Sequence, residues 1–191
     1  MPSPPDFSPS PEERRALLQY ARHVVESAVR HSSFSAVSED PIFSAVRGVF
    51  VTIHAKNKLR GCIGVVEAAE PLRSSIAHCA TGAALHDPRF LPVRPEELEH
   101  LEIEISLLSP PTPIQPADIA LGKHGLIVVS DRRRGLLLPQ VAAEHQLDRE
   151  EFLAETCHKA GLPRDAWKSS AVQILGFTCE VFSDRVEASP K

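Results

Sequence analysis

Apolar residues recur at the three- and four-residue spacing of an amphipathic helix in three stretches, residues 10–31, 71–86 and 148–161. The first stretch opens with Ser10, which is followed three residues later by a glutamate, and this is the capping-box pattern of a helix start. The last stretch opens with an aspartate and a glutamate at the same spacing and ends at Gly161, a residue typical of a left-handed helix stop. We therefore predict three helices.

Five further stretches have the β-branched and apolar content of strands: 48–54, 59–66, 101–108, a hairpin over 122–141, and 172–182. A short polar turn separates the first two, which are predicted to form another hairpin. The elements follow the order helix, hairpin, helix, strand, hairpin, helix and strand. Because this order is not a regular β-α-β alternation, we predict an α+β fold with a mostly antiparallel sheet flanked by helices.

The second predicted strand contains an arginine, two glycines and a cysteine, which is an unusual set for a strand that only fills a core. Strict alternation divides its residues between the two faces of the sheet. The face predicted to point into the core carries Leu59, Gly61, Ile63 and Val65, and the opposite face carries Arg60, Cys62 and Gly64. A thiol and a cation are thereby predicted to share one side of the sheet.

Cys62 is the candidate catalytic residue, with Arg60 as its catalytic partner. The thiolate is the reactive form of cysteine, and a nearby cation favours that form. Gly61 and Gly64 would let a ligand approach the backbone closely, so we assign both to substrate binding. The alternative is that the glycines permit tight packing and that the thiol fills a small pocket.

A second group of candidate residues lies in the motifs H-D-P-R-F and G-K-H-G. Arg89, Lys123 and His124 could hold an anionic group such as phosphate or carboxylate together with Arg60. We therefore assign Asp87, Arg89 and His124 to substrate binding and expect a small anionic ligand. The alternative for Arg89 is an ion pair with Asp87.

Composition narrows the classes of function. The net charge of -4 over 191 residues does not favour a nucleic-acid-binding or membrane-surface protein. No apolar run approaches the roughly 20 residues of a membrane helix, and the N-terminus has no secretory signal, so a cytoplasmic location is predicted. The one dense basic cluster, D-R-R-R-G, is predicted to be a solvated hairpin tip, with RNA contact as the alternative.

The cysteines and histidines do not form a metal-binding pattern, because there is no C-x-x-C and no H-x-x-x-H. No phosphate-binding loop, dinucleotide motif or G-x-S-x-G motif is present, so neither a metal nor a cofactor is predicted. Cys79 and Cys179 fall on apolar faces of their elements and are predicted to be core residues.

The chain shows no linker or internal repeat that would divide it. Residues 1–10 are rich in proline and serine and are predicted to be disordered. Residues 11–186 are predicted to form a single domain.

Several motifs resemble, in the same order, those of the AmmeMemoRadiSam system protein A family, whose members contain an AMMECR domain. The segment L-R-G-C-I-G at 59–64 resembles the family signature, and D-P-R-F at 87–90 resembles the next motif. Further similar segments are G-K-H-G-L-I-V at 122–128, G-L-L-L-P-Q-V at 135–141, E-E-F-L at 150–153, and K-A-G-L at 159–162 followed by Trp167. One departure is Leu147, where the family often carries tryptophan. The resemblance covers roughly residues 47–182.

The resemblance implies an α+β fold with a larger and a smaller lobe and a cleft between them. It also implies a Memo-like protein and a radical SAM protein as partners, and hence redox or radical modification chemistry. The first hypothesis is an enzyme or enzyme subunit that binds a small anionic ligand near Arg60 and Cys62 and works with these partners. The second is a non-catalytic adaptor that presents the same surface to them. An RNA-associated protein is the third.

Overall fold

The computed structural model describes residues 8–33, 40–67 and 69–185. The chain forms two compact units: the described residues of the larger unit fall within 8–108 and 180–185, and those of the smaller unit are 109–179. Helices flank antiparallel strands, so the predicted α+β class with a mostly antiparallel sheet is confirmed. The predicted disorder of the N-terminus concerns residues that lie outside the described part, apart from Ser8 to Ser10.

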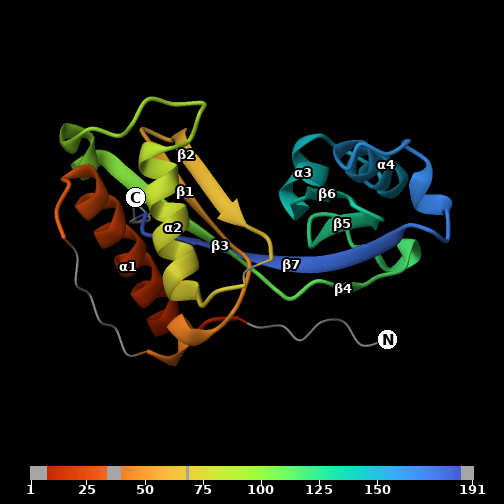
Figure 1. The fold of residues 1–191 in the computed structure, drawn as a ribbon, viewed down its shortest axis with the longest axis horizontal. Coiled ribbons are helices and arrows are strands. Elements are labelled where there is room, and N and C mark those ends of the chain that lie inside the picture. The colour runs from red at the N-terminus through yellow and green to blue at the C-terminus, as the bar shows by residue number, and fades with distance from the viewer. Residues whose placement is uncertain (1–7, 34–39, 68, 186–191) are drawn as a thin grey trace, which may run out of the picture. The chain divides into compact units, whose positions relative to one another are not determined.

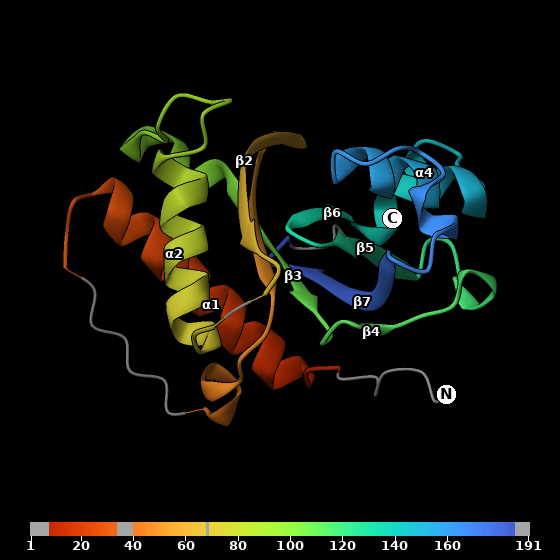
Figure 2. The same ribbon diagram turned by 45° about the vertical axis from the view of Figure 1, so that its right-hand side comes forward.

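The larger unit combines two long helices with one part of the sheet (Figure 1). Its elements are α1 (Pro11–Val29), η1 (Pro41–Ser44), β1 (Val49–Ala55), β2 (Lys58–Val65), α2 (Leu72–Leu85), η2 (Pro95–His100), β3 (Leu101–Leu108) and the last residues of β7 (Gln173–Ser183). The strands follow the order β2-β1-β3-β7, so β2 is an outer strand. Both α1 and α2 lie on the same face of these strands, as Figures 1 and 2 show.

The start of α1 is set by local chemistry, as the sequence predicts. The Ser10 hydroxyl accepts a hydrogen bond from the Glu13 N–H at 3.2 Å, and the Glu13 carboxylate accepts one from the Ser10 N–H at 2.6 Å. The apolar side of the helix, which includes Leu17 and Val25, then packs into the core with β1 and α2. Within the described ranges, no helix has both the length and the apolar character needed to cross a membrane.

The smaller unit is a β-hairpin covered by helices. Its elements are β4 (Thr112–Pro113), η3 (Pro116–Asp118), β5 (His124–Ser130), β6 (Arg133–Leu137), α3 (Pro139–Glu144), α4 (Arg149–Lys159), η4 (Ala166–Lys168) and the first part of β7. Asp148 and Glu151 form the predicted capping box of α4. Gly161 has a φ of +71°, so the predicted left-handed stop after α4 is confirmed.

A hairpin forms within residues 122–141 as predicted, but it is shorter than predicted. β6 ends at Leu137, and α3 begins at Pro139. Proline has no N–H to donate to a strand ladder, and its fixed φ suits the first position of a helix. The apolar residues that follow the strand therefore belong to a helix that the sequence analysis did not predict.

The predicted core position of Cys179 is wrong, because this residue is only half-buried. The buried residues on either side of it along β7 are Phe177 and Phe182, while Val181 is exposed. Phe177 and Phe182 are an odd number of positions apart, so they lie on opposite faces of the strand. A single alternating pattern applied to the whole of β7 therefore assigns residues between Phe177 and Phe182 to the wrong face.

Candidate functional site

Cys62 occupies a defined position in the β1–β2 hairpin. Lys56 and Asn57 form the tight turn with φ values of 51° and 61°. A bulge next to Arg60 then shifts the pairing by one residue, so that Cys62 lies directly opposite Thr52. The Thr52 hydroxyl donates a hydrogen bond to the Cys62 Sγ at 3.2 Å. The half-buried thiol therefore has one fixed polar neighbour.

Because of the bulge, the predicted division of β2 into two faces is wrong for the residues that precede Gly61. Ile63 packs against the core as predicted, whereas Leu59, which lies before the bulge, is 40% exposed. The pairing passes from Leu59 opposite His54 to Gly61 opposite Ile53, which leaves Arg60 as the extra residue. Strict alternation therefore does not extend from Cys62 back to Arg60.

The backbone of Cys62 is held at the free edge of β2. Its N–H donates to Asp87 Oδ2 at 2.9 Å, and its carbonyl oxygen accepts from Arg89 Nη2 at 3.3 Å. In a sheet these two groups would bond to a further strand, and an outer strand leaves them without one. The D-P-R-F segment thus takes the place of a neighbouring strand at this one residue.

Asp87 and Arg89 form a closely bonded pair, which was the alternative considered for Arg89. Arg89 donates from Nε to Asp87 Oδ1 at 2.9 Å and from Nη2 to Oδ2 at 2.7 Å. The Asp87 side chain is 2% exposed, whereas that of Arg89 is 55% exposed. The hydrogen bond from Arg89, followed by that from the Cys62 N–H, holds the pKa of the Asp87 carboxyl well below its usual range, although burial opposes this. The carboxylate therefore stays ionised at neutral pH.

Arg60 has different partners from those expected of a catalytic neighbour. It donates from Nε and Nη2 to the Glu97 carboxylate at 2.8 and 3.1 Å. It also donates to the carbonyl oxygens of Leu91 at 2.7 Å and Pro92 at 3.2 Å. These bonds tie β2 to the segment that follows α2, and the arginine bonded to Cys62 is Arg89.

Gly61 and Gly64 are both required by close packing. A Cβ on Gly61 would lie 2.0 Å from the Ala83 carbonyl oxygen of α2, and one on Gly64 would lie 2.1 Å from the Phe50 ring. Both distances are far below a van der Waals contact. The packing alternative therefore accounts for the two glycines without a ligand, and their role in substrate binding stays a prediction.

His124 belongs to the smaller unit, unlike the other residues assigned to the site. Its Nδ1 accepts a hydrogen bond from the Ala120 N–H at 3.2 Å at the start of β5. Burial, and to a lesser degree the Lys123 charge, lowers the pKa of this histidine. Its observed contacts are those of a turn, and its role in ligand binding stays a prediction.

The other cysteines have environments that differ from that of Cys62. Cys79 is fully buried in the core, as predicted, and burial raises the pKa of its thiol to about 11. Cys157 is also fully buried, and burial raises the pKa of its thiol as well. Cys179 is half-buried like Cys62. Among the described residues, no group of three or more histidine, cysteine or acidic side chains is arranged to hold a metal ion.

Sequence reasoning missed Thr52 and Glu97, the partners of Cys62 and Arg60. A count back from the hairpin turn, where Ala55 pairs with Lys58, would place Thr52 opposite residue 61 rather than Cys62. The bulge changes the count by one, and Gly61 beside it was interpreted as a position for close ligand approach rather than as the sign of a bulge. Glu97 is 37 positions from Arg60, so no local pattern could have paired them.

Known proteins are similar to this chain over most of its length. The AMMECR1 family model matches residues 18–182. A protein from Methanothermobacter thermautotrophicus is 44% identical over 184 residues, which cover 92% of this chain and 96% of the relative. The crystal structure of an uncharacterized protein from Pyrococcus horikoshii is similar with a TM-score of 0.83 and 38% identity, covering 96% of this chain and 97% of that one. The chain therefore belongs to the AMMECR1 family.

Proposed function

We propose that this protein is an enzyme or enzyme subunit whose reactive group is the Cys62 thiol, and that Arg89 binds the anionic part of its substrate. The observation that carries the proposal is a half-buried thiol that accepts a hydrogen bond from Thr52 while Asp87 and Arg89 hold its backbone. The thiol is thereby held in one position by contacts to both its side chain and its backbone.

The surroundings of Cys62 suit nucleophilic chemistry. The thiolate is the nucleophilic form of cysteine, and a hydroxyl donor and a guanidinium are favourable neighbours for an anion. Interaction with Asp87, and to a smaller extent with Cys62, raises the pKa of Arg89. Arg89 is more than half exposed, and its Nη1 has no hydrogen-bond partner among the described residues. This guanidinium can therefore bind a carboxylate or phosphate from solvent.

The reactivity of Cys62 is tested by alkylation of the native protein with iodoacetamide. We expect Cys62 to be labelled at least about ten times faster than Cys179, because the Thr52 hydroxyl and the Arg89 guanidinium near Cys62 favour its thiolate. Peptide mass spectrometry gives the rate at each cysteine. Cys79 and Cys157 should stay unlabelled until the protein unfolds, because both are buried.

Two matched variants serve as controls for this labelling. Cys62→Ser should remove the fast phase, and Cys179→Ser should leave it unchanged. Equal labelling rates at Cys62 and Cys179 in the parent protein would argue against a reactive thiol.

The proposed partners are a Memo-like protein and a radical SAM protein, in the cytoplasm. Their support is the resemblance of the L-R-G-C-I-G and D-P-R-F segments, together with family membership. In this setting the Cys62 site would contribute to a modification reaction that needs all three proteins.

An adaptor without catalysis is the second candidate, and Leu91 favours it. This side chain is 74% exposed in the loop that follows Asp87 and Arg89, and its carbonyl oxygen accepts a hydrogen bond from Arg60. In an adaptor, this outward-facing apolar side chain would contact the partner. The surface that presents Cys62 would then be a binding surface.

Leu91→Ser separates the two candidates when the purified partners are available. An adaptor should lose at least about tenfold in partner affinity with Leu91→Ser and keep its affinity with Cys62→Ser, because only the first substitution removes apolar surface that the partner would bury. An enzyme subunit should lose product formation with Cys62→Ser even where the complex still forms. Analytical ultracentrifugation measures the affinity, and mass spectrometry detects the modified product.

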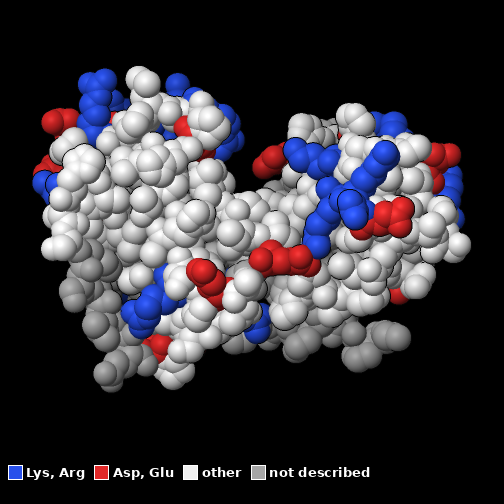
Figure 3. Space-filling view, viewed as in Figure 1, with Lys and Arg blue, Asp and Glu red and all other residues white. Residues whose placement is uncertain are grey.

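RNA association is the third candidate and has less support. The arginines of the D-R-R-R-G segment are exposed at the β5–β6 hairpin, as predicted. On the face shown in Figure 3, however, acidic side chains lie among the basic ones in each unit. The net charge of -4 also opposes binding to a polyanion.

A further inference from the structure

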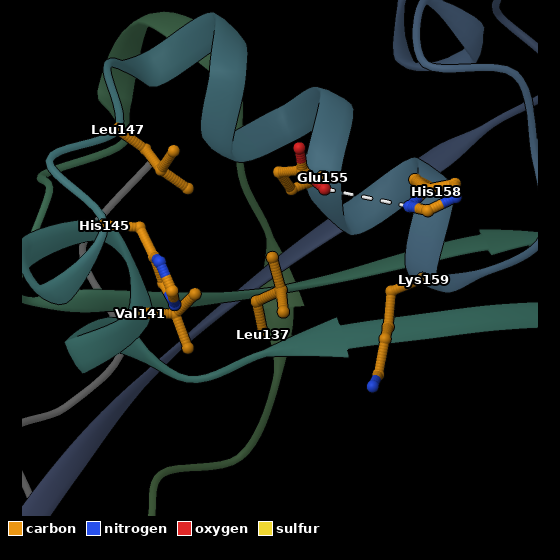
Figure 4. Close-up of a pocket in the computed structure, with 7 residues that line it drawn as sticks. All are labelled: Leu137, Val141, His145, Leu147, Glu155, His158 and Lys159. Atoms are coloured by element: carbon orange, nitrogen blue, oxygen red, sulfur yellow. Dashed lines mark ion pairs between the residues drawn. The ribbon is translucent and has the colours of Figure 1, made fainter.

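The smaller unit contains a cavity of about 390 Å³ that is separate from the residues around Cys62. Its lining comes from the end of β6, from α3 and the loop after it, and from the last turns of α4 (Figure 4). The lining residues are Leu137, Val141, His145, Leu147, Glu155, His158 and Lys159. All of them lie within residues 109–179, so this cavity is a property of one unit.

One part of the cavity lining is aliphatic. Leu137, Val141 and Leu147 pack against the core of the smaller unit and are only partly buried, so each keeps a surface toward the cavity. A volume of this size is near the lower end of the range of roughly 300–1,000 Å³ that small-molecule sites occupy. The aliphatic part therefore suits the apolar body of a small ligand.

The charged groups at the cavity leave one cation without a partner. Glu155 accepts from Arg164 at 2.7 Å and lies 3.7 Å from His158 Nδ1, so its negative charge is compensated (Figure 4). Lys159 makes no ion pair or side-chain hydrogen bond among the described residues, and the His145 imidazole lies on the other side of the cavity. The basic group available to a ligand at the cavity is thus Lys159.

The end of α4 lies close to this cavity, and three of its last carbonyl oxygens already accept hydrogen bonds. A helix C-terminus carries partial negative charge on the carbonyl oxygens that lack partners. Here the N–H groups of Ala160, Gly161 and Leu162 donate back to the carbonyl oxygens of the last turn. Because these oxygens are satisfied, the balance of charge at the cavity favours an anion.

We propose that this cavity is a binding site for a small organic acid that has an apolar body of about six to ten carbons, a size suited to a small-molecule pocket. The carboxylate lies at Lys159, and the apolar body contacts Leu137, Val141 and Leu147. The site does not depend on the proposed chemistry of Cys62, because it uses residues of the smaller unit alone.

The test titrates the full chain with octanoate, acetate and octylammonium and follows the backbone amide signals by two-dimensional NMR. Octanoate should give saturable shifts that centre on α3 and α4. Acetate lacks the apolar body and octylammonium has the opposite charge, so both should bind at least about tenfold more weakly. Equal binding of octanoate and octylammonium, or octanoate shifts centred outside α3 and α4, would overturn the proposal.

Variants of the lining give an independent check. Lys159→Gln should weaken octanoate binding several-fold, whereas Lys168→Gln, at an exposed lysine that does not line this cavity, should leave it unchanged. Leu147→Trp should abolish binding by filling the space. If Leu147→Trp does not fold, the comparison of the two lysine variants decides, and an unchanged affinity in Lys159→Gln refutes the proposed site.

Discussion

Gly61→Ala is expected to destabilise the larger unit by about 3 kcal/mol, near the upper end of the usual cost of overpacking. The added Cβ would lie 2.0 Å from the Ala83 carbonyl oxygen, which is a backbone atom of α2. Because a helix backbone cannot rotate aside as a side chain can, β2 and α2 must separate. Urea unfolding monitored by circular dichroism measures the loss.

Gly82→Ala is the matched control, because it adds the same methyl group at the same α2–β2 interface. Its Cβ would meet the Ile63 side chain at 3.2 Å, a contact that a small movement relieves. Alanine also favours a helix over glycine by about 1 kcal/mol. We therefore expect little change or a slight gain in stability. Equal destabilisation by the two substitutions would contradict the backbone contact as the cause.

Asp87→Asn is expected to lower the free energy of unfolding by about 2–3 kcal/mol at pH 7, since hydrogen bonds to a charged group are lost in a buried position. The carboxylate accepts hydrogen bonds from the Cys62 N–H and from the Arg89 backbone and side chain. An amide has one acceptor oxygen, and its NH2 group would face these donors. Urea unfolding of parent and variant measures the difference.

The difference between parent and Asp87→Asn should depend on pH in a defined direction. Interaction with Arg89 lowers the pKa of Asp87 in the folded state. The folded protein therefore binds fewer protons than the unfolded chain between the two pKa values, and its stability falls as the pH falls through that range. The difference in unfolding free energy between the parent and Asp87→Asn should be constant from about pH 8 to about pH 5 and should shrink below about pH 4. Asp131→Asn, at an exposed position, should have nearly the same unfolding free energy as the parent over this pH range.

The reactivity of Cys62 links these variants to the proposed function. Asp87→Asn disturbs the backbone of Cys62 directly, whereas Gly61→Ala disturbs it through the strand. A change in the labelling rate of Cys62 in both variants, at a urea concentration where both remain folded, would show that the thiol depends on its fixed position.

The sequence by itself determined the elements whose signals are local. The capping box at Ser10, the one at Asp148 and the left-handed stop at Gly161 each involve residues within one turn of helix. The burial of Cys79 follows in the same way from the apolar stripe of its helix. The order of these elements was enough to predict the α+β class.

Only the tertiary structure decided the arrangement around Cys62. The bulge beside Arg60 sets which residue lies opposite the thiol, and the ion pair of Asp87 and Arg89 holds its backbone from 25 or more positions away. Such contacts arise because an outer strand has backbone groups to satisfy and a helix lies against Gly61. Their energy depends on segments that meet only when the chain folds, so residue spacing along the sequence does not contain them.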